Sequence, residues 1–527
     1  MLSEALYYAR MAWHYGRFVK MAAILDPESV VRENFARREQ NFLNLVERGI
    51  IQNPRSPYHE LFRLANCSFE DLGESVRRHG LEKTLEHLRA AGVYLTHEEV
   101  KGKPVRRHGK DIQNDVVATA NPGSSSVGME SVSSGSRSSG TATPTSNEYR
   151  RYRECYENLA FRQFCTPGCA FGFLKPILPS PGALVQMVGV ARSGYSTQRW
   201  FAAGKTANGL YAFVTRLLVA EARLLGCRVP FPTFLEKDDF LPVARWVAGN
   251  KRRGIQTFLP TGVSSASRMC AAAVDASLDI SGTILLASGE AISPARQRVF
   301  QAAGVHAIGR YVISEMGTVG MSCPHLTGNS VHLFGDAVAV IEHRRPAPFV
   351  EAEVNSLLLT SLHPLASRIY INVEMEDAGT LVPATCDCLF SRIGFRTVIQ
   401  DLYSFGKLSS QGMTLGGDVL LTILEERLPE RFGGRPGDYQ LVELEGAAQL
   451  ELQLRVSPRL RNTELNAVRE YFLDQVRLLY GGSLSVRTWE ATSSIQVEAI
   501  EPHQTRSGKV HSLHLAAFGG KTLSGRG

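Results

Sequence analysis

The stretch GTILLASGEAISPARQRVFQAAGVHAIGRY, residues 282–311, decides the fold. Its first seven residues form an apolar run that is typical of a buried strand. Residues 293–304 then carry apolar side chains at helical spacing behind Ser293, a favoured residue at helix starts. Residues 305–311 return to an apolar strand pattern. A strand, a helix and a second strand in succession indicate an α/β fold.

The same alternation extends in both directions from this stretch. Residues 183–191, ALVQMVGVA, predict a strand, and residues 209–226 predict a helix. On the other side, apolar runs at 337–343, 356–362 and 368–375 predict three further strands in a more β-rich part. The central chain therefore predicts a sheet with helices between its strands.

The two ends of the chain differ from this central part. Residues 1–100 are rich in Leu, Ala, Glu and Arg at helical spacing and predict several helices. From about residue 400 the pattern restarts as a helix, paired strands, a second helix, a strand at 484–491 and a terminal strand. We therefore expect a large N-terminal domain, 1–400, and a small C-terminal α+β domain, 401–527.

Composition narrows the class of protein. With 527 residues, of which 44% are hydrophobic, the chain is long enough for two domains. Its formal charge of +7 is spread without a basic tail, which suits small anionic substrates and does not favour nucleic acid. Nine cysteines, an odd number in a large chain, indicate a reducing cytoplasm. No apolar run approaches the roughly 20 residues that span a bilayer, so we expect no membrane insertion.

A segment rich in Ser, Gly and Thr occupies residues 122–146. Such a composition is typical of a flexible linker. Hydroxyls and exposed backbone N–H groups can equally cradle a polyphosphate. From the residues alone, both interpretations stay open.

Gly289 and Glu290 directly follow the strand at 282–288. Ligands bind at such strand ends in open α/β sheets, so this position favours a binding role. The alternative is that Glu290 only supports the start of the helix behind Ser293.

Four more segments complete an ordered set of motifs: GRYVISEMGT at 309–318, VEMEDAGTLV at 373–382, GFRTVIQD at 394–401 and TRSGKV at 505–510. With the hydroxyl-rich loop and LLASGEAISP before them, this order resembles the adenylate-forming superfamily of acyl-CoA synthetases and nonribosomal adenylation domains. The resemblance is strongest to its phenylacetate-CoA ligase-like branch. It implies a large domain that binds ATP and a carboxylic acid, followed by a small lid domain.

The resemblance also implies roles for single residues. GRYVISEMGT is similar to the family's Tyr-Gly-x-Thr-Glu motif, so Tyr311 would flank the adenine and Ser314 would touch phosphate. Glu315 would hold Mg²⁺, a cation that takes oxygen ligands. Asp377 would accept hydrogen bonds from the ribose hydroxyls, or its neighbour Glu376 would do so if the register slips by one. Arg396 would also contact the ribose, the alternative being an ordinary surface charge.

Lys509 is similar to the family's lysine near the chain end, whose ammonium offsets negative charge as pyrophosphate leaves. Gly289 and Glu290 are similar to the pair that lies against the adenine. The loop SSGSRSSGTATPTS is similar to the family's phosphate loop in either of two registers. The candidate phosphate-binding residues of the two registers are Ser134 and Gly135, or Ser139, Gly140 and Thr141.

A second group of residues has metal-ligand character. Cys323, His332, Cys386 and Cys388 offer three thiols and one imidazole, the donor set of a structural zinc site. Phenylacetate-CoA ligase-like proteins carry cysteine, histidine and Cys-x-Cys in this order, which favours His332 over His325. Buried reduced thiols are the alternative.

The resemblance thus implies an enzyme that uses ATP and Mg²⁺ to convert a carboxylic acid to its acyl-AMP. Coenzyme A is the first choice of acceptor for the acyl group. An acyl-carrier or target protein, an amine, or no acceptor at all are the alternatives within the family. A nucleotide-binding scaffold without activity is the alternative from another class.

Overall fold

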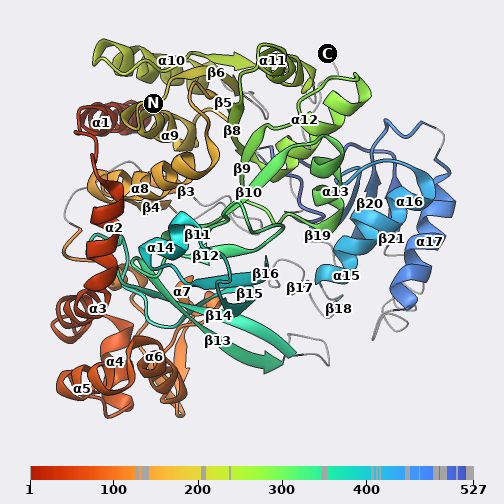
Figure 1. The fold of residues 1–527 in the computed structure, drawn as a ribbon. Helices are drawn as coiled ribbons and strands as arrows, with labels where there is room; N and C mark the ends of the chain where they lie inside the picture. Colours follow the sequence, from red (N-terminus) through yellow and green to blue (C-terminus); the bar gives the residue numbers. More distant parts are fainter. Residues whose placement is uncertain are drawn as a thin grey trace.

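The computed structural model describes residues 2–124, 130–132, 142–202, 209–236, 239–346, 353–404, 409–410, 413–414, 417–445, 451–461, 463–478, 486, 495–505 and 508–517. These residues form a large N-terminal body around a 12-stranded sheet and a smaller C-terminal α+β unit (Figure 1). Among them, no helix has the length and apolar character needed to cross a bilayer.

The first hundred residues are helical, as the sequence predicts. They form a column along one side of the body, coloured red to orange in Figure 1. Its helices are α1 (Leu2–Val19), α2 (Pro27–Ala36), α3 (Arg38–Val46), α4 (Pro57–Leu64), α5 (Phe69–His79), α6 (Leu81–Ala90) and α7 (His97–Val100). A short antiparallel pair follows, β1 (Val105–Arg107) and β2 (Lys110–Ile112).

One half of the large sheet is parallel. Its strands are β5 (Ala170–Leu174), β6 (Thr197–Ala202), β7 (Pro232–Phe234), β8 (Thr257–Gly262), β9 (Ile284–Ser288) and β10 (His306–Ile313). Its helices are α8 (Asn147–Phe164), α9 (Gly182–Arg192), α10 (Gly209–Leu224), α11 (Leu241–Arg252), α12 (Val263–Asp275) and α13 (Pro294–Ala302). The strand order is β7-β6-β5-β8-β9-β10, so the winding direction reverses between β5 and β8. At such a reversal the loops diverge and leave a crevice at the carboxyl ends of the strands.

The stretch 282–311 folds as predicted into β9, α13 and β10. The two strands pair in parallel, with His306 opposite Ile284. The side chain of Ser293 caps α13 by accepting a hydrogen bond from the backbone N–H of Arg296 at 3.3 Å. The predicted helix start is thereby confirmed.

The prediction of a strand at 183–191 is wrong, because these residues form α9. Most of this helix is buried, including its polar residue Gln186. A helix that is apolar on nearly all sides has no visible 3.6-residue period and reads as a continuous apolar run. The neighbouring strand is β5, which precedes the helix.

The other half of the large sheet is antiparallel. It contains β11 (Gly317–Met321), β12 (Val331–Leu333), β13 (Val338–Pro346), β14 (Glu353–Ser361), β15 (Val373–Pro383) and β16 (Thr397–Ser404), with the short helix α14 (Leu389–Ile393). The strands predicted at 337–343 and 356–362 are confirmed as β13 and β14. The strand predicted at 368–375 begins only at Val373, because Asn372 has a left-handed backbone (φ 50°) and interrupts the extended chain.

The C-terminal unit has a four-stranded sheet and a core of its own. Its strands are β19 (Tyr439–Glu445), β20 (Glu451–Val456), β21 (Ile495–Glu498) and β22 (Leu513–Ala517). Its helices are α15 (Gly417–Thr422), η4 (Ile423–Arg427), α16 (Leu428–Phe432) and α17 (Leu465–Arg477). The predicted helix-strand-strand-helix order and the terminal strand are confirmed. The strand predicted at 484–491 lies outside the described residues except for Val486, which is helical.

Candidate functional site

A cavity of about 580 Å³ opens at the carboxyl ends of the parallel strands. It is lined by the residues that follow β5, β8, β9 and β10, around the point where the winding direction reverses. The antiparallel strands β15 and β16 form the opposite wall, and the C-terminal unit closes one side. Seven of the candidate residues from four separate segments line this cavity: Gly289, Glu290, Tyr311, Ser314, Glu315, Asp377 and Lys509.

Lys509 of the C-terminal unit lies directly over Gly289. A Cβ atom added at Gly289 would lie 2.6 Å from Cε of Lys509 and 2.7 Å from its Nζ. Gly289 also has a left-handed backbone, with φ at 91°. The glycine is needed at this position for both reasons, since only it leaves room for the ammonium and adopts this conformation without strain.

The second residue of this pair, Glu290, belongs to a buried polar network. Its carboxylate accepts hydrogen bonds from the backbone N–H and the hydroxyl of Ser264 at 2.7–2.8 Å. Nη1 of Arg296 lies 3.3 Å from Oε2 of Glu290, and Nη2 lies 3.0 Å from Oε1 of Glu425. Burial opposes the charge of Glu290, but Arg296, His511 and Ser264 outweigh it and hold the pKa of the carboxyl below its usual range.

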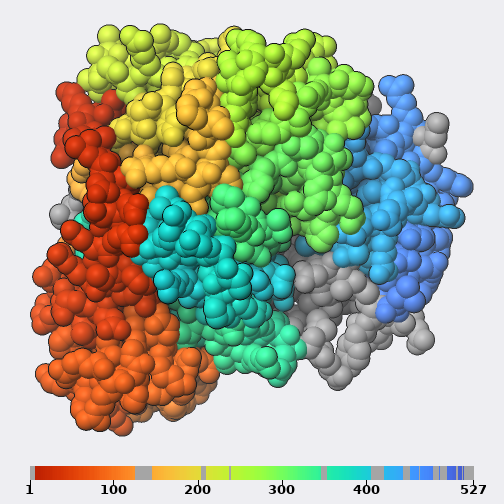
Figure 2. Space-filling model, viewed as in Figure 1, coloured from red at the N-terminus to blue at the C-terminus, as the bar shows by residue number. Residues whose placement is uncertain are grey.

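This network also fastens the C-terminal unit to the large body. Glu425 lies in η4, and its carboxylate accepts hydrogen bonds from the hydroxyls of Ser512, at 2.8 Å, and Ser293. The backbone N–H of Val510 donates to Oγ of Ser264 at 3.2 Å. Figure 2 shows the blue C-terminal residues packed against the green segment that contains α12 and α13. The residue next to Val510 is Lys509, so this docking positions its ammonium.

Tyr311 and Asp377 meet across the cavity. The Tyr311 hydroxyl donates to Oδ2 of Asp377 at 2.7 Å. Both residues lie at strand irregularities: the register of β10 against β11 shifts at Tyr311, and Glu376, next to Asp377, has a left-handed backbone (φ 61°). Such bulges aim side chains away from the regular sheet alternation and are frequent beside binding sites.

Glu315 lies in the turn between β10 and β11 and faces the cavity with Ser314. Burial raises the pKa of its carboxyl, while Arg368 and Lys101 act in the opposite direction. A half-buried carboxylate of this kind is a hard oxygen donor, the ligand type that Mg²⁺ prefers.

Of the remaining residues predicted to bind the nucleotide, the structure describes only Arg396. Arg396 is exposed just before β16 and does not line it. The candidate phosphate-loop residues lie outside the described residues: Ser134, Gly135, Ser139, Gly140 and Thr141.

The sequence interpretation missed a set of cations on the cavity wall. They are Arg150, Arg153, Lys175 and Arg310. Nη2 of Arg310 lies 2.9 Å from Oε1 of Glu157, and Nζ of Lys175 donates to Oε1 of Gln186 at 2.7 Å. Burial, and next the charge of Arg310, lowers the pKa of Lys175 to about 7. Lys175 directly follows β5, just as Gly289 directly follows β9. The sequence pattern identified Gly289 by its position after a strand, but it did not identify β5 as a strand, so Lys175 was missed.

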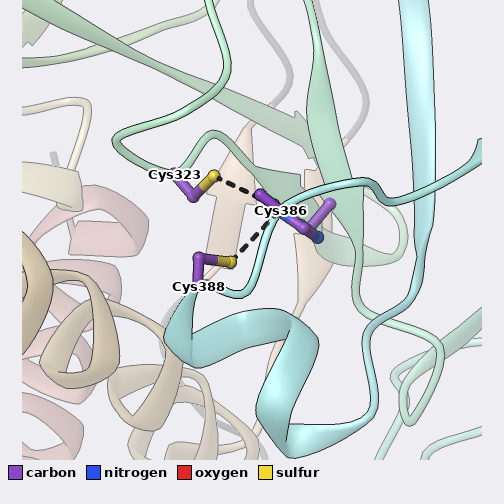
Figure 3. A group of neighbouring side chains, drawn as sticks. Cys323, Cys386 and Cys388 are labelled. Atoms are coloured by element: carbon purple, nitrogen blue, oxygen red, sulfur yellow. Dashed lines mark hydrogen bonds between the residues drawn. The ribbon is translucent and has the colours of Figure 1, made fainter.

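The predicted metal ligands come together away from the cavity. The ligand atoms of Cys323, His332, Cys386 and Cys388 all lie within 4.8 Å of one another. Figure 3 shows the three cysteine side chains pointing toward one another, Cys323 from the loop after β11 and the other two from the segment that enters α14. The cluster is mostly buried.

The spacing of this cluster fits a tetrahedral metal. Sγ of Cys323 and Sγ of Cys386 are 3.7 Å apart, and Nε2 of His332 is 3.3 Å from Sγ of Cys386 and of Cys388. Tetrahedral zinc with ordinary Zn–S and Zn–N bonds requires separations of about 3.8 and 3.5 Å. Nδ1 of His332 lies 2.8 Å from the carbonyl oxygen of Phe395, which leaves Nε2 available to a metal.

No protein-family model and no curated protein sequence matches the chain. Among solved structures, it is similar to 2-hydroxyisobutyryl-CoA ligase in the postadenylation state with R3-HIB-AMP. That match covers 91% of this chain and 88% of the other at 14% identity, with a TM-score of 0.54. The same ligase in the thioesterification state matches at 14% identity, 93% and 90% coverage and a TM-score of 0.47. An ATP-bound RpMatB-BxBclM chimera matches at 11% identity, 76% and 71% coverage and a TM-score of 0.46. The first of these matches establishes that the chain has the α/β fold of this CoA ligase, with a large N-terminal and a smaller C-terminal domain.

Proposed function

We propose that this protein is an adenylate-forming ligase that activates a carboxylic acid with ATP and Mg²⁺ and transfers the acyl group to a thiol. The observation that carries the proposal is the cavity, where motifs from four distant segments meet and Lys509 lies over Gly289. The 2-hydroxyisobutyryl-CoA ligase of the same fold, described with an acyl-AMP, supports this reaction class. We divide the chain near residue 400, into an N-terminal adenylation domain and a C-terminal lid.

In the first half-reaction, a carboxylate oxygen of the acid attacks the α-phosphorus of ATP, and the bond to the β-phosphate oxygen breaks to release pyrophosphate. The side chains supply position and charge. The ammonium of Lys509 would offset negative charge on the reacting carboxylate and phosphate. Asp377, oriented by its hydrogen bond from Tyr311, would accept from the ribose hydroxyls.

Glu315 and the phosphates of ATP would hold Mg²⁺, because the Glu315 carboxylate lines the cavity and offers oxygen ligands. The bound cation would neutralise phosphate charge. Glu290 already accepts from Ser264 and faces Arg296, so its role is to anchor the lid beside the cavity.

In the second half-reaction, a thiol attacks the acyl carbon and AMP leaves. Coenzyme A is the acceptor we propose first, and an acyl-carrier or target protein is the alternative. Zinc, held by the three cysteines and His332, would have a structural role because all four tetrahedral positions would be filled by protein ligands.

ATP–pyrophosphate exchange tests this proposal. A panel of aliphatic, aromatic and dicarboxylic acids would be assayed with wild type and Lys509→Ala. We expect exchange that depends on one class of acid and falls by about 10²–10³-fold in the variant, the usual cost of losing one preorganised charge-stabilising group. Absence of exchange with every acid, although the protein binds ATP, would instead favour a nucleotide-binding scaffold. Adding coenzyme A or a loaded carrier protein to the active mixture would then identify the acceptor.

A further inference from the structure

One wall of the cavity is cationic, and the adenylation chemistry above does not use it. Lys175 follows β5, Gln186 lies on α9 and Arg153 lies on α8, and all three line the cavity. Lys175 and Arg153 are partly buried, and Gln186 is only 6% exposed. Charged groups in such a position require a counter-charge to offset their lost hydration.

The carboxylates on this wall are engaged with other cations. Glu157 pairs with Arg310, and Glu154 pairs with Arg192. Among the residues that the structure describes, Lys175 therefore has no carboxylate as an ion-pair partner.

Hydrogen-bonding capacity also remains at this wall. The Lys175 ammonium has three donors, and the described structure gives it one acceptor, Oε1 of Gln186. The other amide atom of Gln186, Nε2, is buried and has no partner among the described residues. An ammonium and an amide N–H group beside each other form a site for an acceptor with negative charge.

This wall lies to one side of Gly289 and Glu315 in the sheet. In the sheet, β5 is two strands away from β9, which leads to Gly289, and three strands away from β10, which leads to Glu315. With neighbouring strands about 4.8 Å apart, the end of β5 lies about 10 Å from the end of β9. An acid whose reacting carboxylate lies beside Lys509 would therefore extend its other end toward Lys175.

We propose that the acid activated by this protein carries a second anionic group, a carboxylate or a phosphate, which binds Lys175 and Gln186 with Arg153 close by. This inference rests on the proposed function, since it assigns the substrate class of the same cavity. Specificity follows from the same contacts. An acid without the second charge would leave buried donors without an acceptor, which costs far more than losing an apolar contact.

Pyrophosphate exchange with matched acids tests this inference. The probes are succinate, glutarate, adipate, the monomethyl ester of each, and a phosphorylated acid of similar length. We expect wild type to prefer one doubly charged acid over its ester by about 10–100-fold in kcat/KM, the usual worth of a hydrogen-bonded charge. Whether the preferred probe carries a second carboxylate or a phosphate identifies the group.

Variants of Lys175 and Gln186 distinguish binding of the second anionic group from a general effect on activity. Lys175→Met, and independently Gln186→Glu, should lower kcat/KM for the doubly charged acid by about 10–100-fold while the ester and the KM of ATP stay nearly unchanged. Lys251→Met, on the exposed face of α11, is the matched control, and a melting curve verifies that each variant is folded.

Three results would count against these proposals in different ways. Equal use of diacid and ester by wild type would overturn the second anionic group alone. An equal loss for every acid in Lys175→Met, with a raised KM for ATP, would assign Lys175 to the triphosphate instead. Absence of exchange with every acid by a protein that binds ATP would overturn the proposed function and this inference with it.

Discussion

Replacing Gly289 by alanine should remove Lys509 from the cavity without touching the lysine itself. The new methyl carbon would lie 2.6 Å from Cε of Lys509, whereas carbon atoms in contact are about 3.5–4.0 Å apart. The lysine end is flexible, so it moves by about 1 Å or more and the fold is retained. The left-handed backbone at this position adds a strain of about 1–2 kcal/mol.

The catalytic loss is expected to be much larger than the loss of stability. A displacement of about 1 Å can cost 10²-fold in rate, and removal of one preorganised charge-stabilising group costs about 10²–10³-fold. Gly289→Ala should therefore lower pyrophosphate exchange by about 10²-fold. Conversion of a chemically synthesised acyl-adenylate to the thioester should proceed at the wild-type rate, because Lys509 is proposed to serve the first half-reaction only.

Two further variants make this prediction specific. Gly262→Ala alters another glycine that lines the cavity, but its φ is −85° and its new Cβ would meet only a carbonyl oxygen at 3.9 Å. It should keep nearly wild-type exchange. The double variant Gly289→Ala with Lys509→Ala should be no slower than Lys509→Ala alone, because both changes remove the same interaction. Wild-type exchange by Gly289→Ala, or a double variant far slower than Lys509→Ala, would refute the reasoning.

Three other predictions concern the lid, the metal and pH. Glu425→Gln removes the charge that faces Arg296 at 3.0 Å, so it should destabilise the protein by about 1.5–3 kcal/mol and lower the midpoint of urea unfolding. An unchanged midpoint would mean that this contact does not hold the lid. Protein purified without added metal should contain about one zinc per chain by mass spectrometry. The variant with both Cys386→Ser and Cys388→Ser should lose the zinc and melt at a lower temperature, whereas Cys67→Ser should keep the zinc and the wild-type melting temperature. Less than about half an equivalent of zinc in wild type would exclude the site. Burial lowers the pKa of Lys175 to about 7, so its ammonium loses a proton above that pH. In wild type, the KM for a doubly charged acid should therefore rise about 10-fold per pH unit above 7, whereas in Lys175→Met this KM should not change with pH.

The parts of the site that belong to one recognisable strand or helix could be predicted from the local sequence pattern. The residues 282–311 carry strand and helix periods with a helix cap between them, and the structure follows them closely. Gly289 could be proposed because it ends a recognisable strand. In α9, burial on nearly all sides erased the helical period, so the helix was read as a strand and the true strand β5 before it was missed. Lys175, at the end of β5, was missed for the same reason.

Features that depend on strand order could not be predicted from local pattern. The reversal between β5 and β8 determines where the cavity opens, and it follows from long-range pairing. The metal cluster has a similar origin. Pairing of β12 with β16 places His332 opposite Val398, and this brings the segment with Cys386 and Cys388 beside the histidine. The sequence indicated the types of ligand and their order along the chain, whereas the fold brings the four ligand atoms close together.

The docking contacts of the C-terminal unit suit the proposed role of Lys509, which would serve the first half-reaction and leave before the second. Arg296 lies between Glu290 of the large domain and Glu425 of the lid. If the proposed lid moved away, Arg296 would keep Glu290 as its partner and Glu425 would become hydrated, so neither domain would retain a buried charge without a counter-charge. Undocking therefore costs less than the 3–5 kcal/mol of breaking an isolated buried ion pair. Because Val510, which donates to Ser264, is next to Lys509, the same movement would withdraw Lys509 and free the side of the cavity that the proposed attacking thiol would need.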